Sequence, residues 1–179
     1  MSIPPRPVMV IFDRDGVLNV DHGYAFKPEE LEWVPGAMAA VKRANDAGAV
    51  VVIATNQSGI GRGYYSEADM EAFHAEMLRQ LSVIGARIDG VYFAPHHEAA
   101  AEDRYRVADH PDRKPNPGML LRALADFGVA PQDAFMIGDK PSDMEAARRA
   151  GVRGVLYAGG DLEALVTPEL AALTGRTFP

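Results

Sequence analysis

The feature that most constrains this fold is a set of short, continuously apolar segments that run directly into polar clusters. Residues 8–12, 50–54 and 135–137 lead into the sequences DRDG, TNQSG and GDKPSD. Residues 90–94 form a fourth apolar segment, and residues 152–157 are a further candidate strand. Because these segments lack an alternation of apolar and polar residues, they are typical of strands buried on both faces of a parallel sheet.

Helices are predicted between these strands, over residues 35–47, 66–84, 117–127 and 142–150. Glycines follow three of them, and Ser66 resembles an N-cap. A short closing helix is expected from Pro168, with the proline near its start. The alternation predicts an α/β fold with a doubly wound, mainly parallel sheet. We expect a single domain over residues 1–179, with ligand chemistry at the carboxyl ends of the strands.

Composition narrows the range of functions. A length of 179 residues with 47% hydrophobic content suits one core, and a net charge of -7 disfavours a nucleic-acid partner. The chain has no cysteine, which excludes disulfides, thiolate zinc sites and thiol nucleophiles. The N-terminal sequence has neither a signal-peptide pattern nor an apolar membrane span, so we expect a cytoplasmic protein with no membrane partner.

Asp13 and Asp15 lie two residues apart where the chain leaves its first predicted strand, and Gly16 permits a sharp turn. One carboxylate can attack phosphorus while the other protonates the leaving oxygen and then activates water. Taken alone, such a pair is more often a cap or a solvated pair of loop acids. A calcium-binding EF-hand loop does not fit, because its glycine stands at the sixth loop position and this one stands at the fourth.

The other clusters offer complementary groups. TNQSG supplies hydroxyl, amide and backbone donors for phosphate oxygens, although such a cluster, taken alone, is more often an ordinary polar turn. An acid at the end of a buried strand, as Asp139 is, is unfavourable unless it meets a metal or another partner. Asp143 is the simpler candidate for a helix N-cap. Lys114, which follows Arg113, can neutralise a phosphoryl group.

Taken together, four segments in this order resemble the haloacid dehalogenase (HAD) superfamily: FDRDGVLN at 12–19, ATNQS at 54–58, RKPNPGM at 113–119 and IGDKPSD at 137–143. They are most similar to the branch that contains histidinol-phosphate and heptose bisphosphate phosphatases. The resemblance implies a capless HAD-like domain. It also implies a magnesium-dependent phosphatase that works through an aspartyl phosphate.

The resemblance also implies roles for individual residues. Asp13 would be the nucleophile and Asp15 the general acid and base, while Thr55 and Lys114 would stabilise the phosphoryl group. Magnesium would be held by Asp13, the backbone carbonyl of Asp15, and Asp139. The residues expected to face the substrate are Asp21, His22, Tyr24, Asn56, Gln57, Ser58, Arg113 and Lys140.

The segment NVDHGY at 19–24 resembles the substrate loop of heptose bisphosphate phosphatases. It makes a small-molecule sugar phosphate, D-glycero-D-manno-heptose 1,7-bisphosphate, the first expected substrate. Histidinol phosphate and a broader set of phosphomonoesters are the alternatives, and the acidic charge disfavours a polynucleotide phosphatase. A phosphate-binding module without catalysis is the alternative from a different class.

One segment departs from the pattern of this branch, which often carries a zinc loop of three cysteines and a histidine just before RKP. Here the four positions hold Ala94, His96, His110 and Asp112. This set supplies at most three ligands and no thiolate, which disfavours zinc. We therefore expect the loop to be held by its own hydrogen bonds and packing.

Overall fold

The computed structural model describes residues 6–178. Its centre is a parallel sheet with the strand order β3-β2-β1-β4-β5. The strands are β1 (Met9–Phe12), β2 (Val50–Asn56), β3 (Gly90–Ala94), β4 (Ala134–Gly138) and β5 (Arg153–Leu156). Each apolar segment of the sequence forms one of them, so the predicted parallel sheet is confirmed.

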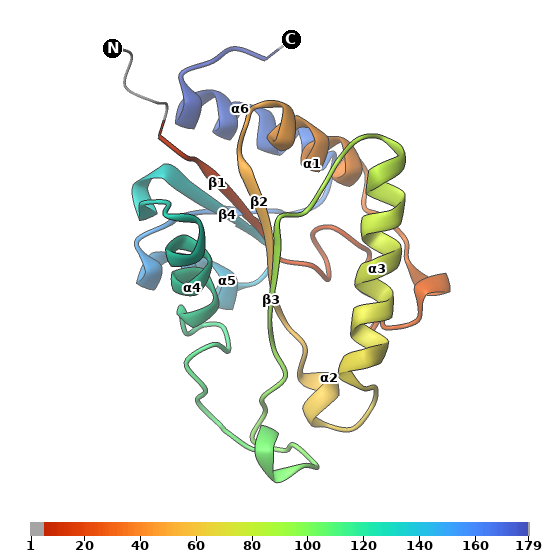
Figure 1. The fold of residues 1–179 in the computed structure, drawn as a ribbon. Coiled ribbons are helices and arrows are strands. Elements are labelled where there is room, and N and C mark those ends of the chain that lie inside the picture. The colour runs from red at the N-terminus through yellow and green to blue at the C-terminus, as the bar shows by residue number, and fades with distance from the viewer. Residues whose placement is uncertain (1–5, 179) are drawn as a thin grey trace.

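Helices cover both faces of the sheet (Figure 1). On one face lie α1 (Ala37–Asp46), α3 (Glu67–Val83) and α6 (Leu162–Thr174), and on the other lie α4 (Gly118–Phe127) and α5 (Pro141–Ala150). The remaining elements are short: α2 (Ser58–Gly61) and the 3-10 helices η1 (Pro28–Glu30), η2 (Asp103–Tyr105) and η3 (Pro131–Asp133). This arrangement confirms the doubly wound α/β fold. No helix within residues 6–178 combines the length and apolar character needed to cross a membrane.

Strand β1 shows why its sequence is continuously apolar. Val10 and Phe12 pack into the core beneath α1, α3 and α6, whereas Met9 and Ile11 pack beneath α4 and α5. All four side chains are fully buried. A central strand covered on both faces has no solvent-facing position, so alternation disappears.

The topology places a ligand site beside β1. From β1 the chain winds outward through β2 to β3, and it then crosses back to place β4 on the other side of β1. Such a reversal opens a crevice at the carboxyl ends of the strands. The backbone amide of Asp13 donates to the carbonyl of Ile137 at 2.9 Å, which ties the ends of β1 and β4 together at this point.

The predicted N-cap at Ser66 is confirmed, but the predicted start of the closing helix is not. Ser66 accepts a hydrogen bond from the amide of Asp69, as its predicted N-cap role requires. The prediction of a helix starting near Pro168 was wrong, because α6 begins at Leu162 and contains Pro168 in its interior. Asp161 caps this helix through the amide of Ala164, and the helix buries three apolar side chains. These contacts outweigh an interior proline, which costs about 3 kcal/mol.

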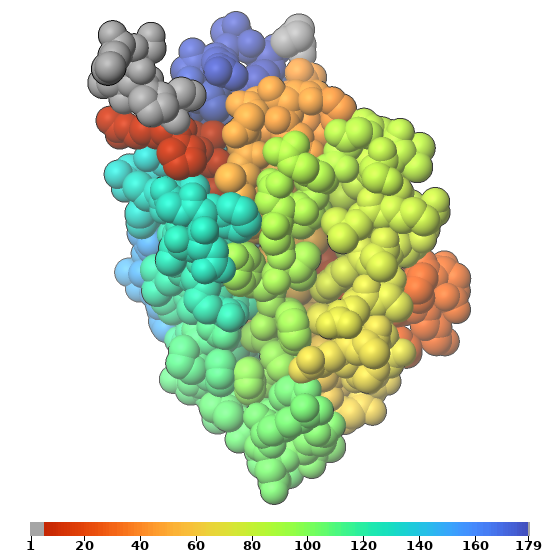
Figure 2. Space-filling model, in the orientation of Figure 1, coloured from red at the N-terminus to blue at the C-terminus, as the bar shows by residue number. Residues whose placement is uncertain are grey.

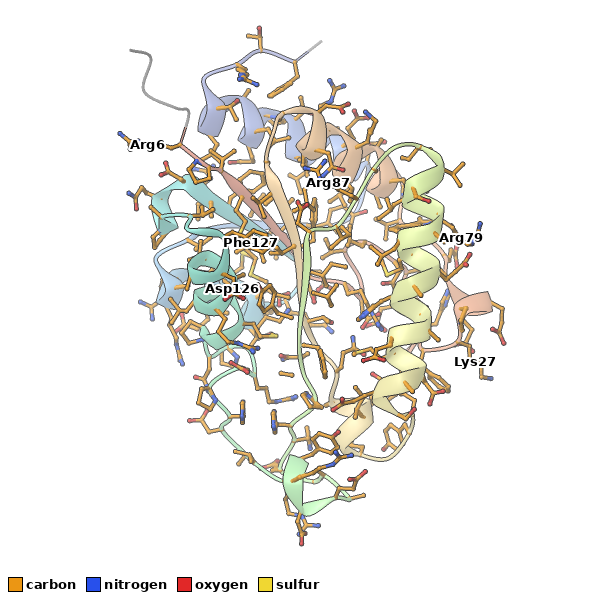
Figure 3. All side chains as sticks on the ribbon, viewed as in Figure 1. Arg6, Lys27, Arg79, Arg87, Asp126 and Phe127 are labelled. Carbon is orange, nitrogen blue, oxygen red and sulfur yellow. The ribbon has the colours of Figure 1, made fainter. Side chains whose placement is uncertain are left out.

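At the end of the molecule opposite α6, the segment after β3 packs against the segment around α2 (Figures 1 and 2). The amide of Ala101 donates to the carbonyl of Gly61 at 2.7 Å, and Ile60, Tyr65 and Tyr105 belong to one small apolar cluster. Asp126, near the end of α4, accepts from the Tyr92 hydroxyl at 2.7 Å and so joins α4 to the edge strand β3 (Figure 3).

Candidate active site

The polar clusters that follow β1, β2 and β4 meet around one cavity of about 420 Å³. It lies where the carboxyl ends of these strands converge. All residues that the sequence placed in the site line this cavity except His22 and Asp139. The lining also includes Gly23, Tyr65, Ser142 and Asp143.

Lys114 is the buried cation of the site. Its Nζ lies 2.9 Å from Asp13 Oδ1, 2.7 Å from Asp143 Oδ1 and 2.9 Å from the carbonyl of Ala54. Burial opposes the charge on Lys114, but the two carboxylates outweigh it and raise the pKa of the ammonium. Burial also raises the pKa of the Asp13 carboxyl to about 7, even though Lys114 acts in the opposite direction. The Lys114 ammonium is therefore a fixed positive charge beside the buried carboxyl group of Asp13.

The acids around Lys114 form a possible metal site. Within residues 6–178, the one group of acids or histidines whose ligand atoms all lie within 4.8 Å of one another is Asp13, Asp139 and Asp143. Asp139 Oδ1 is buried and has no hydrogen-bond partner among the described residues, and burial raises the pKa of this carboxyl. Oxygen ligands of this kind suit Mg²⁺. The set therefore fits a divalent hard cation.

Gly16 makes room for this acid. Its φ is +83°, and a Cβ placed on it would lie 2.3 Å from Asp139 Oδ2. Any side chain at this position would displace the Asp139 carboxylate. The glycine of the DRDG cluster thus allows the loop after β1 to approach the loop after β4.

The prediction of Asp143 as the N-cap of α5 was wrong, because the N-cap is Lys140 and Asp143 is the third residue of the helix. Its carboxylate still accepts from the N-cap amide, and it has a second role that the sequence did not reveal. Its Oδ2 accepts from the amides of Asp139 and Lys140, both at 3.1 Å, at the start of α5. Its Oδ1 pairs with Lys114, and the residue is only 1% exposed. Because the chain from Asp139 to Asp143 turns around this carboxylate, it fixes the position of Asp139 as well as that of Lys114.

Asp15 is held by a residue that sequence reasoning missed. Arg14 has 0% exposure and donates to Asp15 through Nε and Nη2, at distances of 2.9–3.1 Å. Its guanidinium also lies 4.6 Å from the centre of the Phe73 ring and donates to the carbonyl of Ala25. The alternation of side chains along a strand could have indicated this role. Arg14 is two residues beyond the core residue Phe12, so its side chain points toward the same face of the sheet.

The residues after β2 support the site from behind. Gln57 Nε2 donates to Asp15 Oδ2 at 3.0 Å and to the Thr55 hydroxyl at 2.8 Å, and the Tyr65 hydroxyl donates to Gln57 Oε1. Asn56 pairs with the backbone of Lys114 through two hydrogen bonds of 3.0 Å. Gln57 and Asn56 therefore orient the acid and the lysine. Tyr65 carried no recognisable signal in the sequence, because its partner is a side chain in another loop.

Charged and aromatic residues surround the mouth of the cavity. Lys140 Nζ lies 3.8 Å from Asp21 Oδ2, and Arg113 donates to the carbonyl of His96 at 3.0 Å. Tyr24 lines the mouth with a φ of +52°. His22 is exposed and pairs with Glu32 at 2.8 Å, outside the cavity lining. The sequence grouped His22 with these residues, but the structure does not bring it to them.

The four positions that correspond to the zinc loop contact neighbouring side chains and backbone. The rings of His96 and His110 stack with centroids 3.5 Å apart and an interplanar angle of 5°. Asp112 pairs with Arg122 at 3.0 Å, and its amide donates to His110 Nδ1 at 3.1 Å. Ala94 ends strand β3. Hydrogen bonds, an ion pair and ring stacking hold these four positions.

Comparison with known proteins agrees with this geometry. The family model described as HAD-hydrolase-like matches residues 112–172. The D-glycero-beta-D-manno-heptose-1,7-bisphosphate 7-phosphatase of Rhodopseudomonas palustris is 46% identical over 166 residues, which cover 92% of this chain and 91% of the relative.

Two solved structures are similar over most of their length. A HAD-like phosphatase from Mesorhizobium loti has a TM-score of 0.87 at 34% identity, covering 97% of this chain and 90% of its own. The D,D-heptose 1,7-bisphosphate phosphatase from B. bronchiseptica, solved with magnesium and phosphate, has a TM-score of 0.76 at 32% identity, covering 90% and 86%. The chain therefore belongs to the HAD-like phosphatases, the family that includes the heptose bisphosphate 7-phosphatases it matches.

Proposed function

We propose that this protein is a magnesium-dependent phosphatase that removes the 7-phosphate of D-glycero-D-manno-heptose 1,7-bisphosphate, acting as a single capless domain. The observation that carries the proposal is the convergence of Asp13, Lys114 and Asp139 at the carboxyl ends of β1 and β4 in the HAD fold. The names of the R. palustris and B. bronchiseptica relatives support the choice of substrate.

Magnesium would be held by Asp13, the backbone carbonyl of Asp15, and Asp139. When bound, it would draw negative charge from the phosphoryl oxygens. Lys114 offsets the rest of this charge from a fixed position, together with the Thr55 hydroxyl. Asp13 Oδ1 accepts from both Lys114 Nζ and the amide of Arg14, so the carboxylate cannot rotate freely as substrate binds.

The reaction then has two steps. A carboxylate oxygen of Asp13 attacks phosphorus, the bond from phosphorus to the sugar oxygen breaks, and Asp15 gives its proton to the departing oxygen. In the second step water attacks the phosphorus of the aspartyl phosphate, Asp15 takes the proton from that water, and the bond to Asp13 breaks to release phosphate. Asp15 can serve twice because Arg14 and Gln57 hold its carboxylate in one orientation.

The sugar would lie at the mouth of the cavity. Asp21, Tyr24, Ser58, Arg113 and Lys140 line this region and are the residues that we propose for substrate contacts, with Asn56 and Gln57 supporting them from behind. His22 is left out of this proposal, because its imidazole pairs with Glu32 instead.

The test is phosphate release in the presence of magnesium from heptose 1,7-bisphosphate, histidinol phosphate and a simple aryl phosphate. We expect the bisphosphate to have the highest kcat/KM by orders of magnitude. Asp13→Asn keeps the size and polarity of the side chain but removes the nucleophile, so its turnover should fall by about four orders of magnitude or more.

Retained turnover in Asp13→Asn would contradict the proposed nucleophile. A preference for histidinol phosphate would keep the mechanism and replace the substrate, whereas equal slow rates on all three compounds would indicate a general phosphomonoesterase. Phosphate binding without any release would indicate a binding module instead of an enzyme.

A further inference from the structure

Two buried polar side chains at the start of α3 lie behind Asp15 without contacting it. Tyr65 immediately precedes Ser66, the N-cap of this helix, and His74 lies further along the helix. Both residues are only 7% exposed. A phenol or an imidazole is buried at a cost unless its polar atoms find partners. Neither side chain takes part in the two proposed chemical steps, so the partners of each one indicate its role.

His74 is an acceptor for the guanidinium of Arg14. Its Nε2 lies 3.2 Å from Arg14 Nη1. Burial, and then the charge of Arg14, lower the pKa of His74 to about 3, so the ring is neutral. Because a guanidinium can only donate, Nε2 accepts and the proton of the ring is on Nδ1.

This contact determines how the guanidinium of Arg14 is turned. Nε and Nη2 donate to Asp15, and Nη2 also donates to the carbonyl of Ala25. Within residues 6–178, His74 is the hydrogen-bond partner of the third nitrogen, Nη1. The donors of a guanidinium form one rigid planar fork, so an acceptor at Nη1 also fixes the nitrogens that reach Asp15.

Tyr65 acts on the same carboxylate through Gln57. Its hydroxyl donates to Gln57 Oε1, and Gln57 Nε2 donates to Asp15 Oδ2 at 3.0 Å. Burial raises the pKa of the phenol, so the hydroxyl keeps its proton and remains a donor. With its oxygen held by this donor, the amide of Gln57 must present its NH2 group to Asp15.

The packing holds both supporting side chains in place. The ring of Tyr65 stacks on Phe26 with centroids 4.9 Å apart, and a Cβ on Gly59 would overlap the Tyr65 ring. Phe73, the neighbour of His74 on α3, places its ring 4.6 Å from the guanidinium carbon of Arg14. A reacting group keeps a precise orientation only when the residues that hold it are themselves fixed in this way.

We propose that His74 and Tyr65 are positioning residues that hold Asp15 in the orientation it needs as proton donor, His74 through Arg14 and Tyr65 through Gln57. The inference rests on the proposed function, because it concerns the proton that Asp15 gives to the departing sugar oxygen. Both supports begin on one short segment at the start of α3. The general acid is therefore oriented by a part of the fold other than the strands that carry the nucleophile and the metal-binding acids.

The test compares two phosphate esters whose leaving groups differ in their need for a proton. The sugar oxygen of heptose 1,7-bisphosphate needs one, whereas 4-nitrophenolate is a stable anion and leaves from 4-nitrophenyl phosphate without it. The value of kcat/KM reports the steps up to this departure. For the bisphosphate it should fall about 10- to 100-fold in His74→Met and in Tyr65→Phe, because a misplaced general acid loses part of its contribution of about 10²- to 10⁴-fold. For 4-nitrophenyl phosphate the change should stay within about 3-fold.

Two further variants separate positioning from a general loss of structure. His74→Gln offers an amide oxygen to Arg14 where Nε2 now accepts, so it should restore kcat/KM for the bisphosphate to within about 3-fold of the wild type. The matched control is Met77→Val, because Met77 is a buried core residue of α3 whose side chain has no part in these hydrogen bonds. It should lower the Tm but leave the ratio of the two kcat/KM values unchanged. Circular dichroism checks that each variant is folded, and Tyr65→Phe, which removes a single hydroxyl, retains the comparison if His74→Met does not fold.

The outcomes distinguish this inference from the proposed function. If the wild type cleaves both esters but the His74 and Tyr65 variants lose activity equally on the two, or lose none, the positioning role is wrong and the proposed function stands. If the wild type prefers another alkyl phosphate, the heptose assignment fails, and a selective loss on that ester still supports the positioning role. If the wild type releases phosphate from neither ester, both proposals fail.

Discussion

Replacing Arg14 by methionine should be among the most damaging single changes outside the catalytic acids. Methionine fills most of the aliphatic volume but has no donor for Asp15, whose side chain is only 19% exposed. It also leaves the carbonyl of Ala25 without the donor that now lies at 2.7 Å, and it removes the guanidinium from the Phe73 ring.

The magnitude follows from these contacts. Breaking one partner of a buried ion pair costs about 3–5 kcal/mol, and an unpaired buried carbonyl adds about 1–3 kcal/mol. The hydrogen bonds to Asp15 from Asn19 and Gln57 remain and reduce the first cost toward its lower limit. We therefore expect Arg14→Met to lose about 4–6 kcal/mol, a large part of the roughly 5–15 kcal/mol that a domain of this kind has.

Urea unfolding of four proteins measures this loss: the wild type, Arg14→Met, Asp15→Asn and the double variant. The double variant has no uncompensated charge, so it should be more stable than the sum of the two single losses predicts, by about 2–3 kcal/mol. Additive losses, or an Arg14→Met protein within about 1 kcal/mol of the wild type, would refute the argument that this buried pair holds the loop.

Three further changes test separate parts of the structure. Gly16→Ala would place a Cβ against Asp139 Oδ2 and should lower turnover about 100-fold, as measured by phosphate release, while an unchanged rate would show that Asp139 can move freely. Burial and then Arg14 lower the pKa of His74 from 6.5 to about 3. Below about pH 6.5 this imidazole is therefore protonated in the unfolded chain but neutral in the folded one, and the free energy of unfolding should fall by about 1 kcal/mol per pH unit as the pH is lowered. His74→Gln should flatten this slope in thermal unfolding at pH 4–7, and an unchanged slope would assign the acid sensitivity to other groups. Magnesium should raise the Tm of the wild type in proportion to the logarithm of its concentration, and Asp139→Asn should lose most of that rise, whereas an equal rise in both would place the cation elsewhere.

The parallel sheet could be predicted from the sequence because strands that are buried on both faces are continuously apolar. Residues 8–12 could hardly form anything but a central strand, and the polar clusters that follow such strands meet at one sheet edge for topological reasons. The convergence of Asp13, Thr55 and Asp139 was therefore predictable from topology. Lys114 follows no strand and lies 101 positions from Asp13, so its place in the site came from the resemblance to the HAD motifs.

The supporting residues were not predictable, because their roles depend on partners that only the fold brings near. Arg14 between two acids looks like a solvated loop residue until Phe73 and His74 of α3 are placed against it. The prediction of where α6 begins was wrong for a related reason. Local rules place a proline in the first turn, whereas the burial of Leu162 and Val166 against the core sets the true start of the helix.

The charges at the carboxyl ends of β1 and β4 also explain why this site should depend on a divalent ion and not on any cation. Asp13, Asp139 and Asp143 lie within reach of one another, and Lys114 is the one buried ammonium between them in the described lining. Three carboxylates and one ammonium leave two negative charges in a desolvated place, and burial accordingly raises the pKa of both Asp13 and Asp139. A doubly charged cation removes that excess, and the two acids then lose any protons they retain. Metal binding and ionisation of the nucleophile are thereby a single linked equilibrium, so the protein should release protons as it takes up magnesium near pH 7.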